Sequence, residues 1–373
     1  MDNKCLYRPR RKTEWRILTS RDTGYETYYA FPTLLKEGDE VLIAVKTGSR
    51  HWGDREASLS LVCVDIRSQS VKEVQTLFRQ QGLTPQQGEI VRMPCGDLCV
   101  YIDMQKSETN RRTGMWELRS RDGGKTFPVS KPVGSVAGVE YGYPLSMAEK
   151  NGKVYLLAMT FDYLEGGLFR EVHVLSSMDS GASWHFEANL SRMIGAPFNE
   201  SCILPWEKGF LIMTRGERDR TRDGTAEDEY DSGQYMLSVD DQFHVLNMRD
   251  LRHKTGFFSL TGRPRLYWVE DQLCLVTRQR NERADGEKVM TLDLFRIHPE
   301  TLEIQARVRL DEGRFPSQDG HYPVLYLHEG KLHVVTYLSS EMDKGECAET
   351  KCDLVQLSFD LHEILSYGRE ENK

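Results

Sequence analysis

The chain has 373 residues, and 49 Lys and Arg against 57 Asp and Glu give it a formal net charge of −8. Hydrophobic residues make up 39% and charged residues 28%, a composition that excludes a disordered or collagen-like chain and indicates a globular protein. The negative charge argues against nucleic acid or an anionic membrane surface as the main partner. No stretch approaches the roughly 18 consecutive apolar residues that a membrane-spanning helix needs.

The N-terminal segment, residues 1–16, carries six Lys and Arg but no apolar stretch of the kind found in a secretory signal. We therefore expect a cytoplasmic protein, unless a leader precedes this sequence. Eight cysteines are too few for a disulfide scaffold of this length. Cys347 and Cys352 lie close enough in sequence to form a disulfide, or to bind a metal with two further ligands. No such ligands are evident, so we expect neither a metal nor an organic cofactor.

Short apolar runs bounded by turn residues dominate the chain and predict strands, for example at 41–45, 154–158 and 332–336. Helical periodicity is poor, and residues 67–81 form the one window for which we predict a weak helix. The sequence therefore predicts an all-β protein.

One template recurs six times along the chain, each copy consisting of an anchor residue, a short strand, a turn and a second strand. The anchors are Phe31, Glu89, Tyr143, Glu200, Arg263 and Tyr322. They are separated by 58, 54, 57, 63 and 59 residues. A regular period of this length with several short strands is typical of a propeller. We predict a single domain over residues 1–373, a six-bladed β-propeller whose blades have four antiparallel strands.

A shorter repeat lies within two of these units. Residues 120–127 and 177–184 both fit the pattern S-x-D-x-G-x-[ST]-[FW], and residues 238–243 form a degenerate third copy. In such a turn the Asp carboxylate and the Ser and Thr hydroxyls bond the backbone, while Gly supplies a positive φ. The predicted role is therefore structural.

These turns resemble the Asp-box motif of the sialidase (neuraminidase) superfamily, and the six-fold period is similar to that family's six-bladed propeller. The resemblance covers about residues 25–360. It implies an active site on the propeller axis, where the innermost strands begin, and hence at the six anchors. Most of these anchors are ionisable or phenolic, which by itself predicts a polar ligand site rather than a packed ring.

Residues 199–215 resemble a stretch of bacterial sialidases. The resemblance implies that Glu200 pairs with a nucleophilic tyrosine, that Tyr322 is that tyrosine, and that Arg215 binds a substrate carboxylate. The pairing is chemically sensible, because a phenol with a pKa near 10 needs a neighbouring carboxylate to accept its proton. Tyrosine nucleophiles are the sialidase exception to the two-carboxylate rule of glycosidases.

The acid/base residue comes from the first unit. Residues 48–54 resemble the family segment that carries an arginine followed by the catalytic aspartate, which implies these roles for Arg50 and Asp54. Bidentate arginine contacts suit an acidic substrate. The remaining predicted substrate contacts are Arg263, Arg265, His51, His321, Glu89 and Tyr143. The family's first blade usually begins R-I-P, whereas this chain has Ala30-Phe31-Pro32 and lacks that arginine.

The leading interpretation is a retaining exo-glycosidase that removes a terminal acidic, sialic acid-like sugar from a glycan. Two alternatives stay open: a lyase in which a Tyr/His pair eliminates across a uronic acid, and a glycan-binding propeller without activity. Structural interpretations also remain for individual residues: Asp54 as a turn cap, Tyr322 as axial packing, and Glu200, Arg215 and Arg263 as an ion-pair network. The sequence does not predict an oligomeric state.

Overall fold

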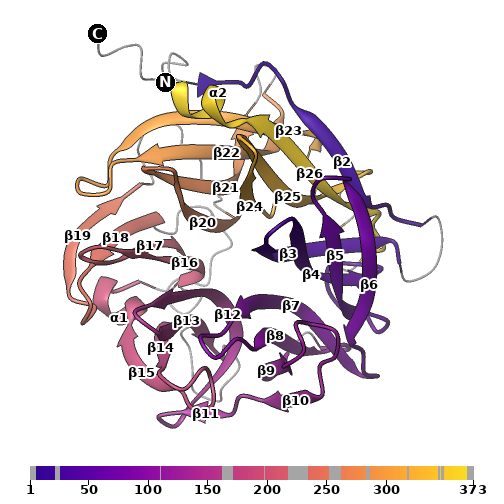
Figure 1. Ribbon diagram of the computed structural model, residues 1–373, viewed down its shortest axis with the longest axis vertical. Helices are drawn as coiled ribbons and strands as arrows, with labels where there is room; N and C mark the ends of the chain where they lie inside the picture. Colours follow the sequence, from indigo (N-terminus) through magenta and orange to yellow (C-terminus); the bar gives the residue numbers. More distant parts are fainter. Residues whose placement is uncertain are drawn as a thin grey trace.

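The computed structural model describes residues 6–21, 26–109, 111–161, 171–196, 198–216, 234–251, 262–282, 286–316, 319–342, 345 and 348–367. The chain is all-β, and its sheets are arranged around a central axis as a β-propeller (Figure 1). Strands that follow one another in sequence are neighbours in each sheet. Strands β3, β7, β12, β16, β20 and β24 lie nearest the axis (Figure 1).

Hydrogen bonding divides the strands among five sheets. One contains β7 (Leu83–Arg92), β8 (Leu98–Lys106), β9 (Arg112–Ser120) and β10 (Val129–Pro132). The next contains β11 (Ser135–Val136), β12 (Val139–Lys150), β13 (Lys153–Thr160), β14 (Val172–Ser177) and β15 (His185–Asn189). A third contains β16 (Phe198–Trp206), β17 (Gly209–Gly216), β18 (Gln234–Val239) and β19 (Val245–Asp250).

The two remaining sheets involve both ends of the chain. One contains β20 (Gly262–Val269), β21 (Gln272–Glu282), β22 (Lys288–Ile297), β23 (Ile304–Pro316) and, in parallel, β1 (Leu6–Tyr7). The other joins β24 (Val324–His328), β25 (Lys331–Ser339), β26 (Cys352–Asp360) and β2 (Thr13–Leu18) to β3 (Tyr28–Glu37), β4 (Glu40–Gly48), β5 (Ser58–Asp65) and β6 (Ser70–Phe78). Among the described residues, a single parallel pair, Cys352 with Tyr28, connects β26 to β3.

The N-terminal strand closes the ring of sheets. Strand β2 runs antiparallel to β26, the last strand of the chain, with Thr13 opposite Ser358. Pairing the first and last segments covers the outer edge of β26, which would otherwise expose unpaired backbone groups. Two short helices, α1 (Leu190–Ile194) and α2 (Leu361–Ser366), complete the secondary structure of the described residues, and neither is long enough to cross a membrane.

The core lies between neighbouring sheets and is built from the strands that the apolar runs predicted. Strand β17, for example, packs Phe210 against Tyr155 of β13, with ring centroids 4.6 Å apart, and against Phe243, with centroids 5.2 Å apart. The predicted strands at 41–45, 154–158 and 332–336 are confirmed as parts of β4, β13 and β25.

The predicted helix at 67–81 is wrong, because Ser70–Phe78 is the outer strand β6. The error has a physical cause. Val71 lies opposite Val64 and Val74 opposite Val62, so a step of three residues along β6 matches a step of two along β5, which is a β-bulge. The extra residue spaces the apolar side chains by three, which imitates a helical period.

The turns at 120–127 and 177–184 make the same set of hydrogen bonds. In the second, Asp179 accepts from the backbone N–H and hydroxyl of Ser183, at 2.9 and 2.6 Å, and from the hydroxyl of Ser177 at 2.8 Å. Asp122 repeats these contacts with Thr126 and Ser120. The first turn joins β9 to β10 and the second joins β14 to β15, in each case the second and third strands after the innermost one, so both turns lie at the end of the propeller opposite to the N-termini of the innermost strands.

Candidate functional site at the propeller axis

The structure brings all six anchors together at one end of the axis. The guanidinium of Arg263 contacts Glu89 and donates to the hydroxyl of Tyr143 at 3.2 Å. Its backbone N–H donates to Glu200 at 2.8 Å, and its guanidinium carbon lies 5.8 Å from the ring of Tyr322. Phe31 completes the ring, with its centroid 5.3 Å from that of Tyr322.

The strands reach this end with an irregular backbone. Hydrogen-bond register shifts occur near the start of β3, β7, β12, β16 and β20. Phe31, Arg263 and His321 have φ values of 55°, 44° and 56°. A bulge re-aims the following side chain, and left-handed φ at non-glycine residues is typical of functional sites. The bulges therefore turn the anchors toward one another.

Further residues join the anchors through contacts given below. We call the whole set the axial cluster, and it consists of Tyr28, Phe31, Lys46, His51, Glu89, Tyr143, Glu200, Arg215, Arg263, Arg265, Arg278, Asp319, Tyr322 and Tyr337.

Glu89, Arg263 and Arg265 form a buried ion network. Both guanidinium groups contact Glu89 Oε1, and the residues are 5%, 3% and 8% exposed. The sequence analysis predicted substrate contacts for all three. With the guanidinium groups paired and covered in this way, the geometry favours the alternative interpretation, a network that stabilises the centre of the propeller.

Glu200, like Glu89, accepts hydrogen bonds from described residues through one carboxylate oxygen. Its Oε2 accepts from Arg215 Nη1 at 2.6 Å and from the backbone of Arg263. Its Oε1 accepts no hydrogen bond from a described residue. Burial, followed by the charge of Glu200, raises the pKa of Tyr143 well above its usual value, so that phenol stays neutral.

Tyr322 is buried, at 6% exposed, and its hydroxyl forms no hydrogen bond with any described residue. Two cations flank the ring: the guanidinium carbon of Arg278 lies 5.2 Å from its centroid and that of Arg263 lies 5.8 Å away. A phenol without a described hydrogen-bond partner at the end of the axis has the chemistry of a candidate nucleophile.

Asp54, the predicted acid/base residue, is 1% exposed and lies inside its own loop. Its Oδ2 accepts from the backbone N–H groups of Ser49 and Arg50, at 2.6 and 3.2 Å, and its Oδ1 accepts from that of Glu56 at 3.2 Å. This is the geometry of a loop cap. The structure shows no contact between Asp54 and Tyr322 among the described residues.

Arg50 and His321 point away from the anchors. Arg50 donates to Glu349 at 3.0 Å near the surface. His321 is fully buried, and its Nε2 lies 2.9 Å from Asp311. Neither geometry favours the predicted substrate contact.

Sequence reasoning missed Asp319, which joins four members of the axial cluster. The hydroxyls of Tyr28 and Tyr337 donate to it at 2.6 and 2.8 Å, His51 Nδ1 lies 3.4 Å away, and Arg278 Nη1 lies 3.9 Å away. Burial alone would raise the pKa of Asp319. The hydrogen bond and charge of His51, the charge of Arg278 and the hydroxyl of Tyr28 outweigh burial and hold that pKa well below its usual range.

Lys46 was also missed. It is fully buried, and its Nζ donates to the backbone oxygens of Arg50 and His51, at 3.0 and 2.6 Å, and to Gln86 Oε1 at 2.9 Å. Burial lowers its pKa to about 8, although nearby carboxylates, Asp54 first among them, act in the opposite direction.

The sequence did contain a signal for these positions. Lys46, Arg215, Arg278 and Tyr337 each follow the anchor of their own repeat at the same spacing, the one that separates Arg215 from Glu200. At that distance the second strand has returned to the end at which the first began, so residues with this spacing face the axial end.

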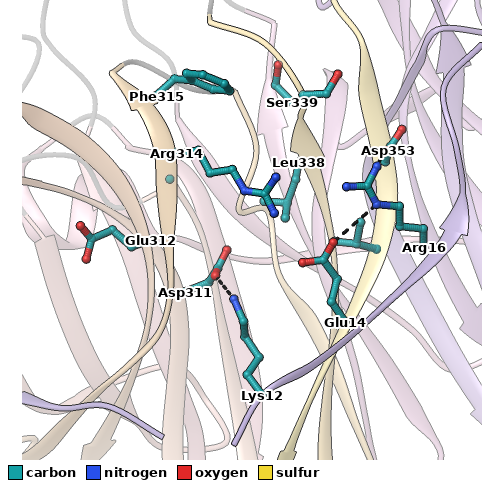
Figure 2. Close-up of a pocket in the computed structure, with 13 residues that line it drawn as sticks. Lys12, Glu14, Arg16, Asp311, Glu312, Arg314, Phe315, Leu338, Ser339 and Asp353 are labelled. Atoms are coloured by element: carbon teal, nitrogen blue, oxygen red, sulfur yellow. Dashed lines mark hydrogen bonds and ion pairs between the residues drawn. The ribbon is translucent and has the colours of Figure 1, made fainter. Parts of the chain in front are cut away.

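A separate pocket of about 170 Å³ lies between β2, β23, β25 and β26. Figure 2 shows that charged side chains line it, with Lys12 paired to Asp311 and Arg16 directed at Glu14. Arg16 also pairs with Asp353 at 2.7 Å. This pocket is outside the axial cluster.

The cysteine predictions are only partly testable. Cys352 is buried and free, whereas Cys347 lies outside the described residues. In the part of the chain that the structure describes, no group of three His, Cys, Asp or Glu residues could hold a metal ion.

No protein-family model matches this chain, and no curated protein matches it. Solved structures do match. A protein of unknown function from Dyadobacter fermentans is 15% identical with a TM-score of 0.65, and the match covers 93% of this chain and 99% of that one. The shared feature is the fold.

Two further structures are glycosidases. The NanB sialidase from Streptococcus pneumoniae is 13% identical with a TM-score of 0.62, and the match covers 94% of this chain and 71% of that chain. The α-L-arabinofuranosidase Arb93A from Fusarium graminearum is 11% identical with a TM-score of 0.63, over 95% and 99% of the two chains. At these identities the similarity shows that the chain shares their overall fold, but it does not indicate which substrate the chain binds.

Proposed function

We propose that this protein is a retaining exo-glycosidase that releases a terminal acidic sugar at the axial cluster. The observation that carries the proposal is the hydroxyl of Tyr322, which has no hydrogen-bond partner among the described residues and whose ring lies 5.8 and 5.2 Å from the guanidinium carbons of Arg263 and Arg278. The sialidase and arabinofuranosidase with the same overall fold support glycoside chemistry, as does the sequence resemblance to sialidases.

We also infer that the propeller has six blades and that its repeated turns are Asp-boxes. The single residue pair between β26 and β3 supports counting the eight-stranded sheet as two blades, the second completed by β2. The matching hydrogen bonds around Asp122 and Asp179 support the Asp-box assignment.

In the proposed mechanism the oxygen of Tyr322 attacks the anomeric carbon while the bond to the leaving oxygen breaks. The Oε1 of Glu200 takes the phenolic proton, and an acid protonates the leaving oxygen. Water then attacks the anomeric carbon and gives a proton to the conjugate base of that acid, the tyrosine leaves, and the proton on Glu200 returns to it. No hydrogen bond joins Glu200 and Tyr322 in the described structure, but such contacts often tighten only when substrate binds. The mechanism does not use Asp54, because backbone N–H groups occupy its carboxylate.

Two arginines favour an acidic sugar. Arg215 and Arg278 follow their anchors at the same spacing in sequence, and their side chains are 22% and 12% exposed at the axial end. A planar guanidinium suits a carboxylate. Lys46 lies next to the position of the missing first-blade arginine, but its three hydrogen bonds hold it beneath the site, so we do not expect it to bind substrate.

The test is release of fluorophore from a panel of aryl glycosides that includes sialic acid and uronic acids. The wild type should hydrolyse an acidic member, Tyr322→Phe should lose at least about 100-fold in kcat/KM, and Tyr155→Phe, a core control distant from the axis, should keep its activity. Silence of the wild type across the panel, or full activity of Tyr322→Phe, would contradict the proposal. Binding of a sugar without turnover would indicate the glycan-binding alternative.

A lyase remains the second candidate, since one observation favours it. The rings of His51 and Tyr322 both contact that of Phe31, with centroids 4.9 and 5.3 Å from its own, so a candidate base and a candidate acid lie in the same part of the axial cluster. A lyase would produce an unsaturated uronate that absorbs in the ultraviolet, and a hydrolase would not.

A further inference from the structure

The backbone around His51 is fixed by hydrogen bonds to buried side chains. Lys46 and Gln86 donate to its backbone oxygen at 2.6 and 2.9 Å. From the other side, Asp54 accepts from the backbone of Ser49 and of Arg50. Buried Lys46 and buried Asp54 therefore fix the backbone on either side of the His51 side chain. A fixed backbone of this kind preorganises a reacting group.

The imidazole itself is oriented by rings and by a carboxylate. The rings of Phe31 and Trp52 meet it edge to face, with centroids 4.9 and 5.5 Å away. Asp319 Oδ2 lies 3.4 Å from its Nδ1. Asp319 is fixed in turn by the hydroxyls of Tyr28 and Tyr337. A carboxylate at Nδ1 selects the tautomer that leaves Nε2 for chemistry.

The other ring nitrogen has no such partner. His51 Nε2 forms no hydrogen bond with a described residue, and the side chain is 22% exposed. Trp52, 40% exposed, lies beside the ring and offers an apolar surface next to that nitrogen. The imidazole therefore lies beside an indole on which a sugar ring could pack.

We propose that His51 is the proton-transfer residue of the axial site and that Asp319 is its positioning residue. This inference rests on the proposed glycosidase function. The imidazolium gives its Nε2 proton to the leaving oxygen as the bond from that oxygen to the anomeric carbon breaks, and the bonding electrons stay on the oxygen. In the second step neutral His51 takes a proton from the attacking water, which restores the imidazolium.

The test compares two glycosides of the sugar that the panel identifies, one with a dinitrophenyl leaving group, which needs no acid, and one with a methyl leaving group, which does. His51→Gln should lose about 100-fold or more in kcat/KM on the methyl glycoside and less than about tenfold on the dinitrophenyl glycoside. Asp319→Asn should show the same contrast with a smaller loss. The control is His244→Gln, which breaks a surface His–Asp pair of 2.9 Å and should change neither rate. Equal losses on both glycosides, or no loss, would overturn the proposal.

A second measurement needs no substrate and separates this inference from the function itself. Nitrogen-15 NMR of the histidine side chains, recorded at a pH high enough to deprotonate the imidazolium, should show neutral His51 with its proton on Nδ1, and Asp319→Asn should shift the population of the neutral ring toward the other tautomer. A proton on Nε2 in the wild type would overturn the dyad. If the wild type were silent on the whole panel, the glycosidase proposal would fail, and the tautomer would still decide whether Asp319 positions His51.

Discussion

The buried network around Glu89 gives the sharpest prediction for stability. Glu89→Gln keeps the size of the side chain but removes the one carboxylate that both Arg263 and Arg265 contact. All three side chains are buried, so two guanidinium groups would be left without a counter-charge in a region that water barely reaches. Removing one partner of a buried pair typically costs about 3–5 kcal/mol. We therefore expect the free energy of unfolding to fall by about 3–5 kcal/mol.

The assay is urea unfolding followed by tryptophan fluorescence. Glu108→Gln is the matched control, because Glu108 pairs with Arg55 at 3.3 Å with both side chains largely exposed. Exposed pairs contribute about 0–1 kcal/mol. Adding Arg265→Met to Glu89→Gln should restore part of the lost stability, since it removes one unpaired buried charge. A Glu89→Gln protein within about 1 kcal/mol of the wild type would refute the reasoning.

Three further predictions concern single groups. Lys46 has a folded-state pKa of about 8, below its ordinary value of 10.5, so between these pH values the unfolded chain binds a proton that the folded chain does not. The stability of the wild type relative to Lys46→Met should therefore rise by about 3 kcal/mol between pH 8 and 10.5, as measured by urea unfolding at a series of pH values. A stability difference that does not change with pH would contradict this prediction. Asp54→Ala should lower the free energy of unfolding by about 1–3 kcal/mol, because three backbone N–H groups lose their acceptor. An unchanged urea midpoint together with lost turnover would instead support the predicted catalytic role of Asp54. Hydrogen bonds from the side chain and the backbone of Ser183 lower the pKa of Asp179 to about 2. The stability that this turn contributes should therefore be present above about pH 4 and be lost as the pH falls toward 2. Thermal unfolding of Asp179→Asn should not show this loss of stability at low pH.

Local patterns were sufficient to predict the strands, the repeat and the six anchors. Alternating and continuous apolar runs report burial residue by residue, and the anchors recur because each innermost strand begins in the same way. The pattern failed at β6, where a bulge changed the spacing of Val71 and Val74.

The sequence alone does not predict which side chains from different repeats contact one another. Asp319 has its partners 268 and 291 residues away, at His51 and Tyr28, and only the closed ring brings them together. The same holds for Glu89 and Arg263, 174 residues apart, whose pairing makes a predicted substrate contact part of the core. The constant spacing from the anchors could have indicated Lys46 and Arg278, but not whether either can meet a ligand.

The central claim is that Tyr322 is the nucleophile of a glycosidase site on the axis. The most direct measurement uses a fluorinated donor of the sugar that the panel identifies, which slows hydrolysis of a covalent intermediate, followed by mass spectrometry of the digested protein. We expect a single glycosyl adduct on the peptide that contains Tyr322, and none in Tyr322→Phe. Turnover of that sugar by the wild type, with the adduct on another residue or with inversion at the anomeric carbon, would contradict the claim.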